Sequence, residues 1–445
     1  MRMQNNVNLK ERDHQVTWDF TLKNNPKYIV KQAKNMRCRE GVLQSGTLYE
    51  WVLSDVDEKR SISVEDLLAV VEIPYYDQNT HSYKARYGGV TSGGSFLFQK
   101  KGALTFEAVA EGIERPAIVY YTAPDQTIWT VMVGGKAICI NGNGVLRTFP
   151  QTNLLSCACF YKHRLFLAEE QNVLLYSAPE DFMNFEQSLE GGGEISFPNA
   201  GGNIIGLKAF QEALYVFFDR GILRVEIKGN PKDFAAESIE YSGGSIFART
   251  ICVCGEGILF MASDGVYRLH GKKAERLFAD FIQLPVRETK EEACAGLSDR
   301  AFIRYETSAG KRTLVLASDG KDCYYADDLT ALSYVERANA LFVDEEYLIC
   351  RLTDAGKQAR KGVFKTETDF GVSGYKTLRK LRFEGEGAFI LTVEADKRKR
   401  MRKVTLEDGF AEVELSERGK TFKISFSASD KLTLRKLSAE LKTVT

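Results

Sequence analysis

The residues from 160 to 229 alternate between short apolar runs and tight polar turns. The apolar runs cover 164–168, 173–177, 206–210, 214–218 and 222–227, and each is bounded by Gly, Asn, Asp or a group of charged residues. Runs of this length between such turn residues are typical of β-strands joined in hairpins. This stretch therefore predicts a series of short antiparallel strands.

The same pattern recurs along the chain. Segments 258–271 and 313–328 repeat the form of segment 213–229, which is an apolar strand, a polar turn containing Gly and a second strand. Leu165, Leu214, Ile258 and Leu314 begin comparable strands, at intervals of 49, 44 and 56 residues. An all-β repeat of this length is typical of propeller blades, which are stable when packed between neighbours in a ring. We expect a β-propeller of six or seven blades over residues 46–370.

The two ends of the chain differ from this repeat. Residues 1–45 are polar and are predicted to be irregular, whereas 371–445 alternate regularly between polar and apolar positions. Asp408–Gly409 and Arg418–Gly419 are the expected turns of a small C-terminal β-sandwich-like domain. Residues 277–295 interrupt the alternation and predict a helix or a long loop between blades. The fold class is therefore all-β, a propeller followed by a small β domain.

Composition and charge add few constraints. The chain has 445 residues, with 60 Lys and Arg against 60 Asp and Glu, so a formal net charge of zero gives no global case for nucleic acid or membrane binding. No stretch is apolar enough to span a bilayer, and the first residues lack a signal-peptide core. The nine cysteines form no C-x-x-C pair. We therefore expect synthesis in a reducing cytosol.

Two cysteine pairs are the first candidates for chemistry. Cys157 and Cys159, like Cys252 and Cys254, share one face if they lie in strands, so two thiolates could converge on a metal. The intervening repeat has Leu207 and an alanine at the matching place. Because a free cysteine behaves as a small buried hydrophobe, we predict that all four are core residues.

Catalytic motifs are not found in a fitting context. The four histidines form no H-x-H or H-E-x-x-H pattern, and no nucleophile elbow, P-loop or dinucleotide fingerprint is present. Ser263-Asp264-Gly265 and the similar turn at 318–320 lack the spacers and the tryptophan of sialidase Asp-boxes. We predict a non-enzymatic protein without catalytic, cofactor or metal residues. Abundant carboxylates leave a carbohydrate-binding or glycan-hydrolysing propeller as an alternative, and a protein-scaffolding propeller as another.

One strong charge run remains as a candidate interaction site. Its basic residues are Lys397, Arg398, Lys399, Arg400, Arg402 and Lys403. They could contact a nucleic acid backbone or an acidic partner. The competing interpretation is a solvated hairpin between strands at 390–395 and 404–406. Alternate residues of a strand point apart, so such charges would not form a single-faced patch.

The order of several segments resembles a family of propeller proteins from short-tailed bacteriophages and prophages. In that family a strand opened by Arg leads to a Tyr-Ser-Ala, Pro, Asp, Phe element, followed by a strand with an apolar Leu-Tyr-Val-Phe ending. The corresponding residues here are 164–167, 176–182 and 205–217. Residues 33–37, 41–43, 368–371 and 376–382 also resemble elements near the two ends of that family's chains. The resemblance covers most of residues 27–445.

The resemblance implies a structural protein of the virion. The family includes tail tubular (nozzle) proteins and the packaged-DNA stabilisation hub, which form rings below the portal and close or extend the DNA channel. For this chain it implies a homo-oligomeric ring, most plausibly a hexamer, with portal, adaptor and tail proteins as partners and genome DNA passing through. The expected location is the virion, after synthesis in the bacterial cytoplasm.

Overall fold

The computed structural model describes residues 11–18, 20, 28–52, 59–62, 64, 66–100, 105–151, 153–169, 172–188, 191–198, 200–228, 233–277, 286–287, 293–307, 310–320, 322–335, 339–353, 356–396 and 398–444. Strands dominate these residues, and none of the helical segments among them is long and apolar enough to cross a membrane. Contacts divide the chain into two compact units. One comprises residues 51–321 and 328–352, and the other comprises 1–50, 322–327 and 353–445.

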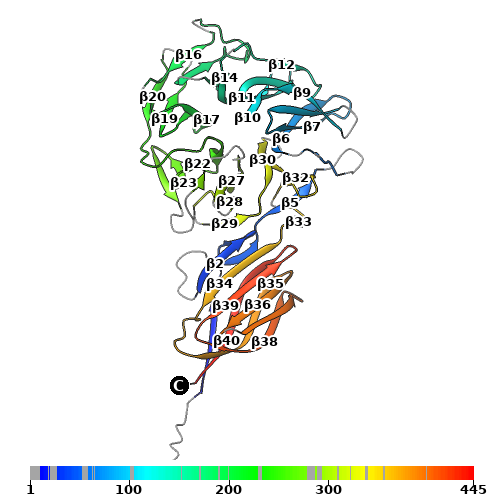
Figure 1. The fold of residues 1–445 in the computed structure, drawn as a ribbon, viewed down its shortest axis with the longest axis vertical. Helices are drawn as coiled ribbons and strands as arrows, with labels where there is room; N and C mark the ends of the chain where they lie inside the picture. Colours follow the sequence, from blue (N-terminus) through cyan, green and yellow to red (C-terminus); the bar gives the residue numbers. More distant parts are fainter. Residues whose placement is uncertain are drawn as a thin grey trace, which may run out of the picture. The chain divides into compact units, whose positions relative to one another are not determined.

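The first unit is a β-propeller with seven blades in its described residues (Figure 1). Each blade is a group of consecutive antiparallel strands, and one residue pair, Gly135 with Leu155, joins the strands of blades 2 and 3 in a single sheet. Blade 1 contains β6 (Leu67–Asp77), β7 (Ser82–Thr91), β8 (Ser95–Gln99) and β9 (Phe106–Glu111); blade 2 contains β10 (Ile113–Thr122), β11 (Ile128–Asn141) and β12 (Leu146–Thr148); blade 3 contains β13 (Leu155–Tyr161), β14 (Arg164–Glu169), β15 (Val173–Tyr176) and β16 (Gly193–Ser196).

The remaining blades follow the same plan. Blade 4 contains β17 (Ile204–Phe210), β18 (Ala213–Phe218), β19 (Gly221–Glu226) and β20 (Ala235–Ser238); blade 5 contains β21 (Cys252–Cys254), β22 (Gly257–Ala262), β23 (Gly265–His270) and β24 (Lys273–Leu277); blade 6 contains β25 (Val286–Arg287), β26 (Ala293–Gly296), β27 (Arg300–Thr307) and β28 (Gly310–Ala317); blade 7 contains β30 (Thr330–Val335), β31 (Asn339–Val343) and β32 (Ile349–Leu352). A 3-10 turn, η3 (Ala248–Thr250), precedes blade 5.

The apolar runs at 164–168, 214–218 and 258–262 become the second strands of their blades. In β18 and β22 every residue is buried, because a blade packs against a neighbour on each of its two faces. Phe217 of blade 4 and Phe260 of blade 5 meet edge to face, with ring centroids 5.5 Å apart. Similar apolar clusters join blades 1 and 2, 2 and 3, and 3 and 4. The inter-blade clusters are therefore the core of this unit.

Blade 7 closes the ring onto blade 1. Leu341 and Ile349 of blade 7 pack in one cluster with Leu67 and Val70 of blade 1. The segment that precedes blade 1 also pairs with β32, since the Val52 amide donates to the Ile349 carbonyl at 2.9 Å. A chain segment from before the first blade thus completes the last one. The predicted propeller of six or seven blades is confirmed, with seven.

The second unit is a β-sandwich. One sheet has the order β3 (Met36–Arg39), β4 (Val42–Ser45), β40 (Thr433–Val444), β35 (Lys376–Glu386) and β38 (Phe410–Gly419), and β1 (Glu11–Trp18) pairs with β40. The other contains β2 (Tyr28–Lys34), β34 (Gly362–Thr368), β39 (Phe422–Ala428), β36 (Ala388–Ala395) and β37 (Arg398–Thr405), and β2 also pairs in parallel with β29 (Cys323–Ala326). A short antiparallel pair, β5 (Leu48–Trp51) with β33 (Gln358–Ala359), belongs to a separate sheet.

Aromatic rings join the two sheets face to face. Phe383 of β35 lies 5.1 Å from Phe389 of β36 and 6.0 Å from Phe426 of β39, measured between ring centroids. Phe20, from the N-terminal part of the chain, meets Phe426 at 6.0 Å. The predicted sandwich-like domain is therefore confirmed, and residues from both ends of the chain build its core.

The predicted domain boundaries are wrong at both ends of the chain. Residues 1–45 were expected to be irregular, but four strands lie in their described part, and these belong to the sandwich. Likewise the sandwich does not begin at residue 371, because β34 already lies between β2 and β39. The physical reason is non-local pairing, since β1 pairs with β40 in register from Glu11–Val444 to Trp18–Leu437.

The segment at 277–295, predicted to be a helix or a long loop, is a strand wherever it is described. β24 ends at Leu277, and β25 and the start of β26 follow at 286–287 and 293–295. Residues 278–285 and 288–292 lie outside the described part of the chain.

Arg164 explains the Arg-to-Tyr-Ser-Ala element of the sequence. It begins β14, is 4% exposed, and its guanidinium donates hydrogen bonds to the carbonyl oxygens of Ser177 and Gly191, at 2.7 and 2.6 Å. The guanidinium also lies over the Tyr176 ring, 5.5 Å from its centroid. A single buried side chain therefore fastens the segment after β15 to the start of β14.

We expect Arg164→Met to destabilise the propeller by about 2 kcal/mol, because two buried carbonyl groups lose their charged donor. Urea unfolding followed by circular dichroism measures the change. Arg220→Met is the matched control, since Arg220 lies in an exposed turn and donates its one described side-chain hydrogen bond to Ser245 at 3.4 Å. Equal stability of the two variants would contradict the assigned role of Arg164.

Candidate functional site

A cavity of about 760 Å³ lies at the centre of the propeller. Residues of blades 1, 2, 3, 4, 6 and 7 line it, together with the segment that precedes blade 5. Representative lining residues are Ala69 of blade 1, Ala117 of blade 2, Cys157 of blade 3, Lys208 of blade 4, Ile251 beside blade 5, Cys294 of blade 6 and Ser333 of blade 7. The cavity is thus the central channel of the ring.

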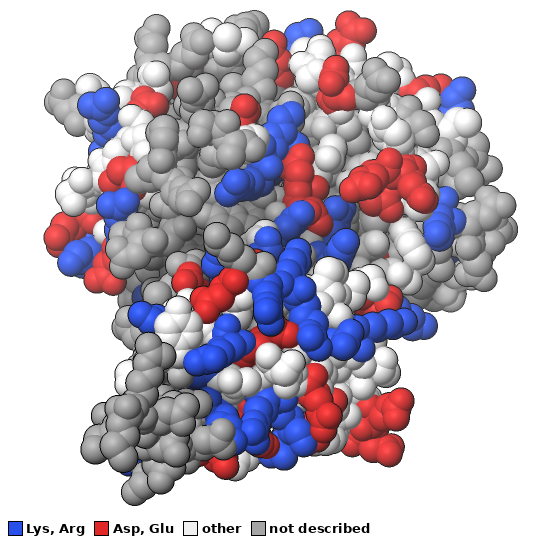
Figure 2. Space-filling view, turned by 60° about the horizontal axis from the view of Figure 1, so that its bottom comes forward, with Lys and Arg blue, Asp and Glu red and all other residues white. Residues whose placement is uncertain are grey.

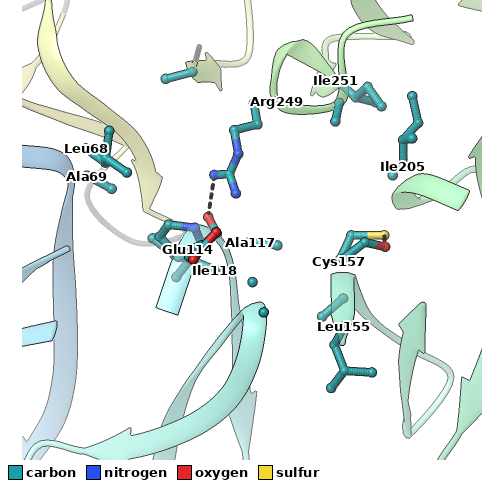
Figure 3. Close-up of a pocket in the computed structure, with 18 of the residues that line it drawn as sticks. Leu68, Ala69, Glu114, Ala117, Ile118, Leu155, Cys157, Ile205, Arg249 and Ile251 are labelled. Atoms are coloured by element: carbon teal, nitrogen blue, oxygen red, sulfur yellow. Dashed lines mark hydrogen bonds between the residues drawn. The ribbon is translucent and has the colours of Figure 1, made fainter. Parts of the chain in front are cut away.

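Cations outnumber carboxylates on the channel wall. Lys136, Lys208 and Arg249 line it together with one acidic residue, Glu114. Arg249 reaches across the channel from η3 and donates a hydrogen bond to the Pro116 carbonyl oxygen at 3.2 Å (Figure 3). In a concave site with apolar walls, such an excess of positive charge attracts anions. The channel is therefore suited to an anionic guest rather than a cationic one.

The predicted core cysteines are buried, which confirms the interpretation from the sequence. Cys157, Cys159, Cys252 and Cys254 are each at most 7% exposed. Burial raises the pKa of the Cys157 thiol to about 12, although Ser156 donates a hydrogen bond to its sulfur at 3.7 Å. Burial likewise raises the pKa of Cys254 to about 12. These thiols stay protonated at neutral pH.

The basic run forms strand β37 rather than the turn of a hairpin. Arg398 to Lys403 are all exposed, and β37 is the edge strand of its sheet, paired only with β36 within that sheet. The register places Arg400 opposite Val393 and Lys399 opposite Glu394. Because Val393 is buried, the arginines at 398, 400 and 402 lie on the core-facing side and the lysines on the outer side. The predicted alternation is confirmed, while Lys397 lies outside the described residues.

Arg400 has a structural partner. Its Nε lies 2.7 Å from Oε1 of Glu417, a carboxylate of β38 that is only 4% exposed. Arg400 therefore links the two sheets at one edge of the sandwich and is not free for a ligand. Figure 2 shows Lys and Arg side chains gathered on one face of the molecule, with Asp and Glu side chains among them. The candidates for an outside partner are thus Arg398, Lys399, Arg402 and Lys403.

An exposed aromatic pair marks the outer end of blade 1. The rings of Tyr76 and Tyr83 meet edge to face with centroids 5.3 Å apart, and the residues are 42% and 55% exposed. Asp77 and Lys84 form an ion pair at 2.8 Å beside them. The hydrogen bond from Lys84 holds the pKa of Asp77 at about 2. Aromatic and carboxylate groups together can contact a sugar, so this pair is the place to test for glycan binding.

Within the described part of the chain, no three His, Cys, Asp or Glu side chains gather in a way that could hold a metal ion. The sequence prediction missed three residues of the channel, namely Lys208, Arg249 and Cys294. Lys208 lies in β17 and Cys294 lies in β26, the strands of blades 4 and 6 that line the channel. An alignment of the repeats with each other was therefore the signal that could have identified these two residues. Cys294 was hidden because its segment was predicted to be a helix or a loop.

No protein-family model matches the chain, and no curated protein matches it. Similar solved structures include BBS1N in complex with ARL6DN, at 9% identity and a TM-score of 0.47, over 70% of this chain and 98% of that one. BamB from Moraxella catarrhalis has 10% identity and a TM-score of 0.41, over 77% of this chain and 98% of that one. PorZ from Porphyromonas gingivalis has 12% identity and a TM-score of 0.41, over 81% of this chain and 46% of that one. Similarities at this level indicate nothing about function.

Proposed function

We propose that this chain is a non-enzymatic structural protein of a bacteriophage or prophage tail, a subunit of the nozzle or hub ring below the portal. The observation that carries the proposal is the ordered set of segments at 164–167, 176–182 and 205–217, which resembles that family. The hydrogen bonds of Arg164 explain why the first two of these segments occur together. The buried guanidinium at the start of β14 holds the chain after β15 in place through the Ser177 and Gly191 carbonyl groups.

The mechanism of such a protein is geometric. A closed propeller is rigid because each blade packs between two others, and a sandwich built from both chain ends adds a second rigid body. Copies that contact each other through two different surfaces close into a ring when the rotation between them permits. The proposed six-fold ring encloses genome DNA and contacts portal, adaptor and tail proteins in the virion, after assembly in the bacterial cytoplasm.

Coexpression with the portal and adaptor proteins encoded nearby tests this proposal. Negative-stain images are expected to show cyclic particles that contain this chain, and a genome neighbourhood with portal, terminase and capsid genes is expected as well. Monomers that never associate with either protein, in a genome without phage neighbours, would overturn the proposal.

The exposed residues of β37 provide a sharper test. The triple variant Lys399→Gln, Arg402→Gln, Lys403→Gln removes three charges and leaves the Arg400–Glu417 ion pair intact. We expect this variant to lose a measurable part of its association with DNA or with an acidic partner, and to show a weaker salt dependence. Lys272→Gln with Lys273→Gln, at the exposed turn before β24 and at its first residue, is the control. If both variants bind DNA or the acidic partner equally well, β37 is not part of the interface.

A glycan array separates the tail proposal from a carbohydrate-binding propeller. The tail proposal predicts no glycan signal that depends on Tyr83. Binding that is lost in Tyr83→Ala, with unchanged thermal stability, would favour the carbohydrate alternative instead.

A further inference from the structure

The wall of the propeller channel is aliphatic between its cations. Ala117, Ile118 and Ile205 line the cavity and are half-buried, because one side of each packs against a cluster between blades and the other side faces the cavity. No aromatic side chain belongs to the described part of this wall. The cavity has the volume of a small-molecule pocket. A guest of that size therefore meets hydrocarbon and has no ring to stack on.

The two hydroxyl groups in the described part of the wall already join the blades to each other. Ser156 of blade 3 donates a hydrogen bond to the Ile204 carbonyl oxygen of blade 4 at 3.0 Å. Ser333 of blade 7 donates one to the Val70 carbonyl oxygen of blade 1. A sugar or a nucleobase in the channel would lose hydrogen bonds to water and gain few from side chains in return. The cations are therefore the groups that recognise a guest.

Arg249 is held in the channel from both ends. The 3-10 turn η3 that carries it is fastened by the buried Thr250, whose hydroxyl donates to the Phe247 carbonyl oxygen at 2.7 Å and accepts from the Met261 amide at 2.9 Å. At the other end, the guanidinium donates to the Pro116 carbonyl oxygen at 3.2 Å. A charged group that is already fixed in place loses little entropy when a ligand binds, so this cation is preorganised for an anion.

Lys208 brings a second positive charge to the same part of the cavity. It lies on β17, lines the cavity and is half-buried. Burial raises the pKa of the Cys157 thiol, and the charges of Lys208 and Arg249 both oppose that rise. The two cations therefore lie within electrostatic reach of one point on the wall. In Figure 3 the Arg249 side chain extends into the cavity, with Cys157 and Ile205 to its right.

We propose that the propeller channel binds a small aliphatic anion. Its carboxylate or phosphate group contacts Lys208 and Arg249, and its short hydrocarbon chain lies against Ala117, Ile118 and Ile205. A guanidinium matches the geometry of either anionic group, and an ammonium adds a point charge. Burial of the hydrocarbon chain removes apolar surface from water. This site goes beyond the tail proposal and does not depend on it, since the DNA of that proposal passes through the ring of subunits and not through one propeller.

Calorimetric titration of the full chain with octanoate, octyl phosphate, octanol and octylamine tests the proposal, because these probes share one hydrocarbon chain and differ in the head group. We expect the two anions to bind, octanol to bind at least about ten-fold more weakly because it lacks charge-assisted hydrogen bonds, and octylamine to give no measurable heat. Tighter binding of octanoate would identify carboxylate as the preferred head group, and tighter binding of octyl phosphate would identify phosphate. Equal affinity for octanoate and octanol, or no binding of either anion, would overturn the proposal.

Lys208→Gln tests where the anion binds. This variant is expected to bind the preferred anion about ten-fold more weakly and octanol as well as the wild type does, since octanol needs the hydrocarbon wall alone. Arg249→Gln is a second variant with the same expected loss, and thermal unfolding verifies that each variant folds. Lys228→Gln is the matched control, because Lys228 follows β19 of the same blade, is exposed and pairs with Glu226 at 3.9 Å. If Lys208→Gln binds the anion as tightly as Lys228→Gln does, the anion does not bind in the channel and the proposal is wrong.

Discussion

Replacement of Phe426 by alanine is expected to destabilise the β-sandwich by about 3–5 kcal/mol, the range measured when a large buried aromatic side chain is truncated. Phe426 is fully buried on β39. Its ring meets four others at centroid distances between 5.7 and 6.2 Å, from Phe20, Phe364, Phe383 and Phe389. These rings come from both ends of the chain, so one cavity loosens every part of this core at once.

Urea unfolding of the full chain measures this effect, and Phe410→Ala is its control. Phe410 begins the edge strand β38 and is 46% exposed, so its loss is expected to cost well under 1 kcal/mol. Limited proteolysis of Phe426→Ala adds a spatial readout. Cleavage is expected to increase at both termini together, because β1 pairs with β40. Increased cleavage confined to the C-terminal strands would contradict a sandwich that both chain ends share.

The propeller could be predicted because its signal is repeated and local. Strands such as β18 and β22 are continuous apolar runs, which require burial on both faces, and they recur at a nearly constant interval. The packing of blades against each other supplies that burial. Repeated apolar runs therefore predicted the architecture even where a turn lacks the Gly, Asn or Asp residues that favour positive φ. Lys162 and His163 form one such turn, and both have positive φ.

The N-terminal strands could not be predicted because their pattern is weak. In β1, Arg12, Asp13 and Gln15 are exposed, so the strand has no clear apolar face. Its stability comes from the backbone ladder with β40 and from contacts such as the 3.0 Å hydrogen bond between His14 Nε2 and Thr443 Oγ1. The partner strand lies more than four hundred residues away in the sequence, and no local pattern encodes that pairing.

The channel was missed for a related reason. Lys208, Arg249 and Cys294 come from three different repeats, and each stands alone among apolar neighbours in the sequence. Only closure of the ring brings them to one cavity. The basic run of β37 was visible because its charges are consecutive, but its buried partner Glu417 was not. Sites assembled by a closed ring are therefore poorly marked in any one segment.

Gly296→Ala is expected to destabilise the propeller by about 3 kcal/mol or more, because it overpacks the contact between blades 5 and 6. A Cβ atom on Gly296 would overlap the Val253 carbonyl oxygen and would lie 3.5 Å from the Cβ of Cys252. The nearer atom belongs to the backbone and cannot rotate away. The strand β26 must therefore move off β21, which opens the ring at one joint.

The control for this variant is Gly93→Ala, whose added Cβ would meet only the Thr91 hydroxyl oxygen, at 3.8 Å, and which is expected to be nearly neutral. Thermal unfolding separates the two variants. Unchanged stability of Gly296→Ala would contradict the close packing of β21 against β26.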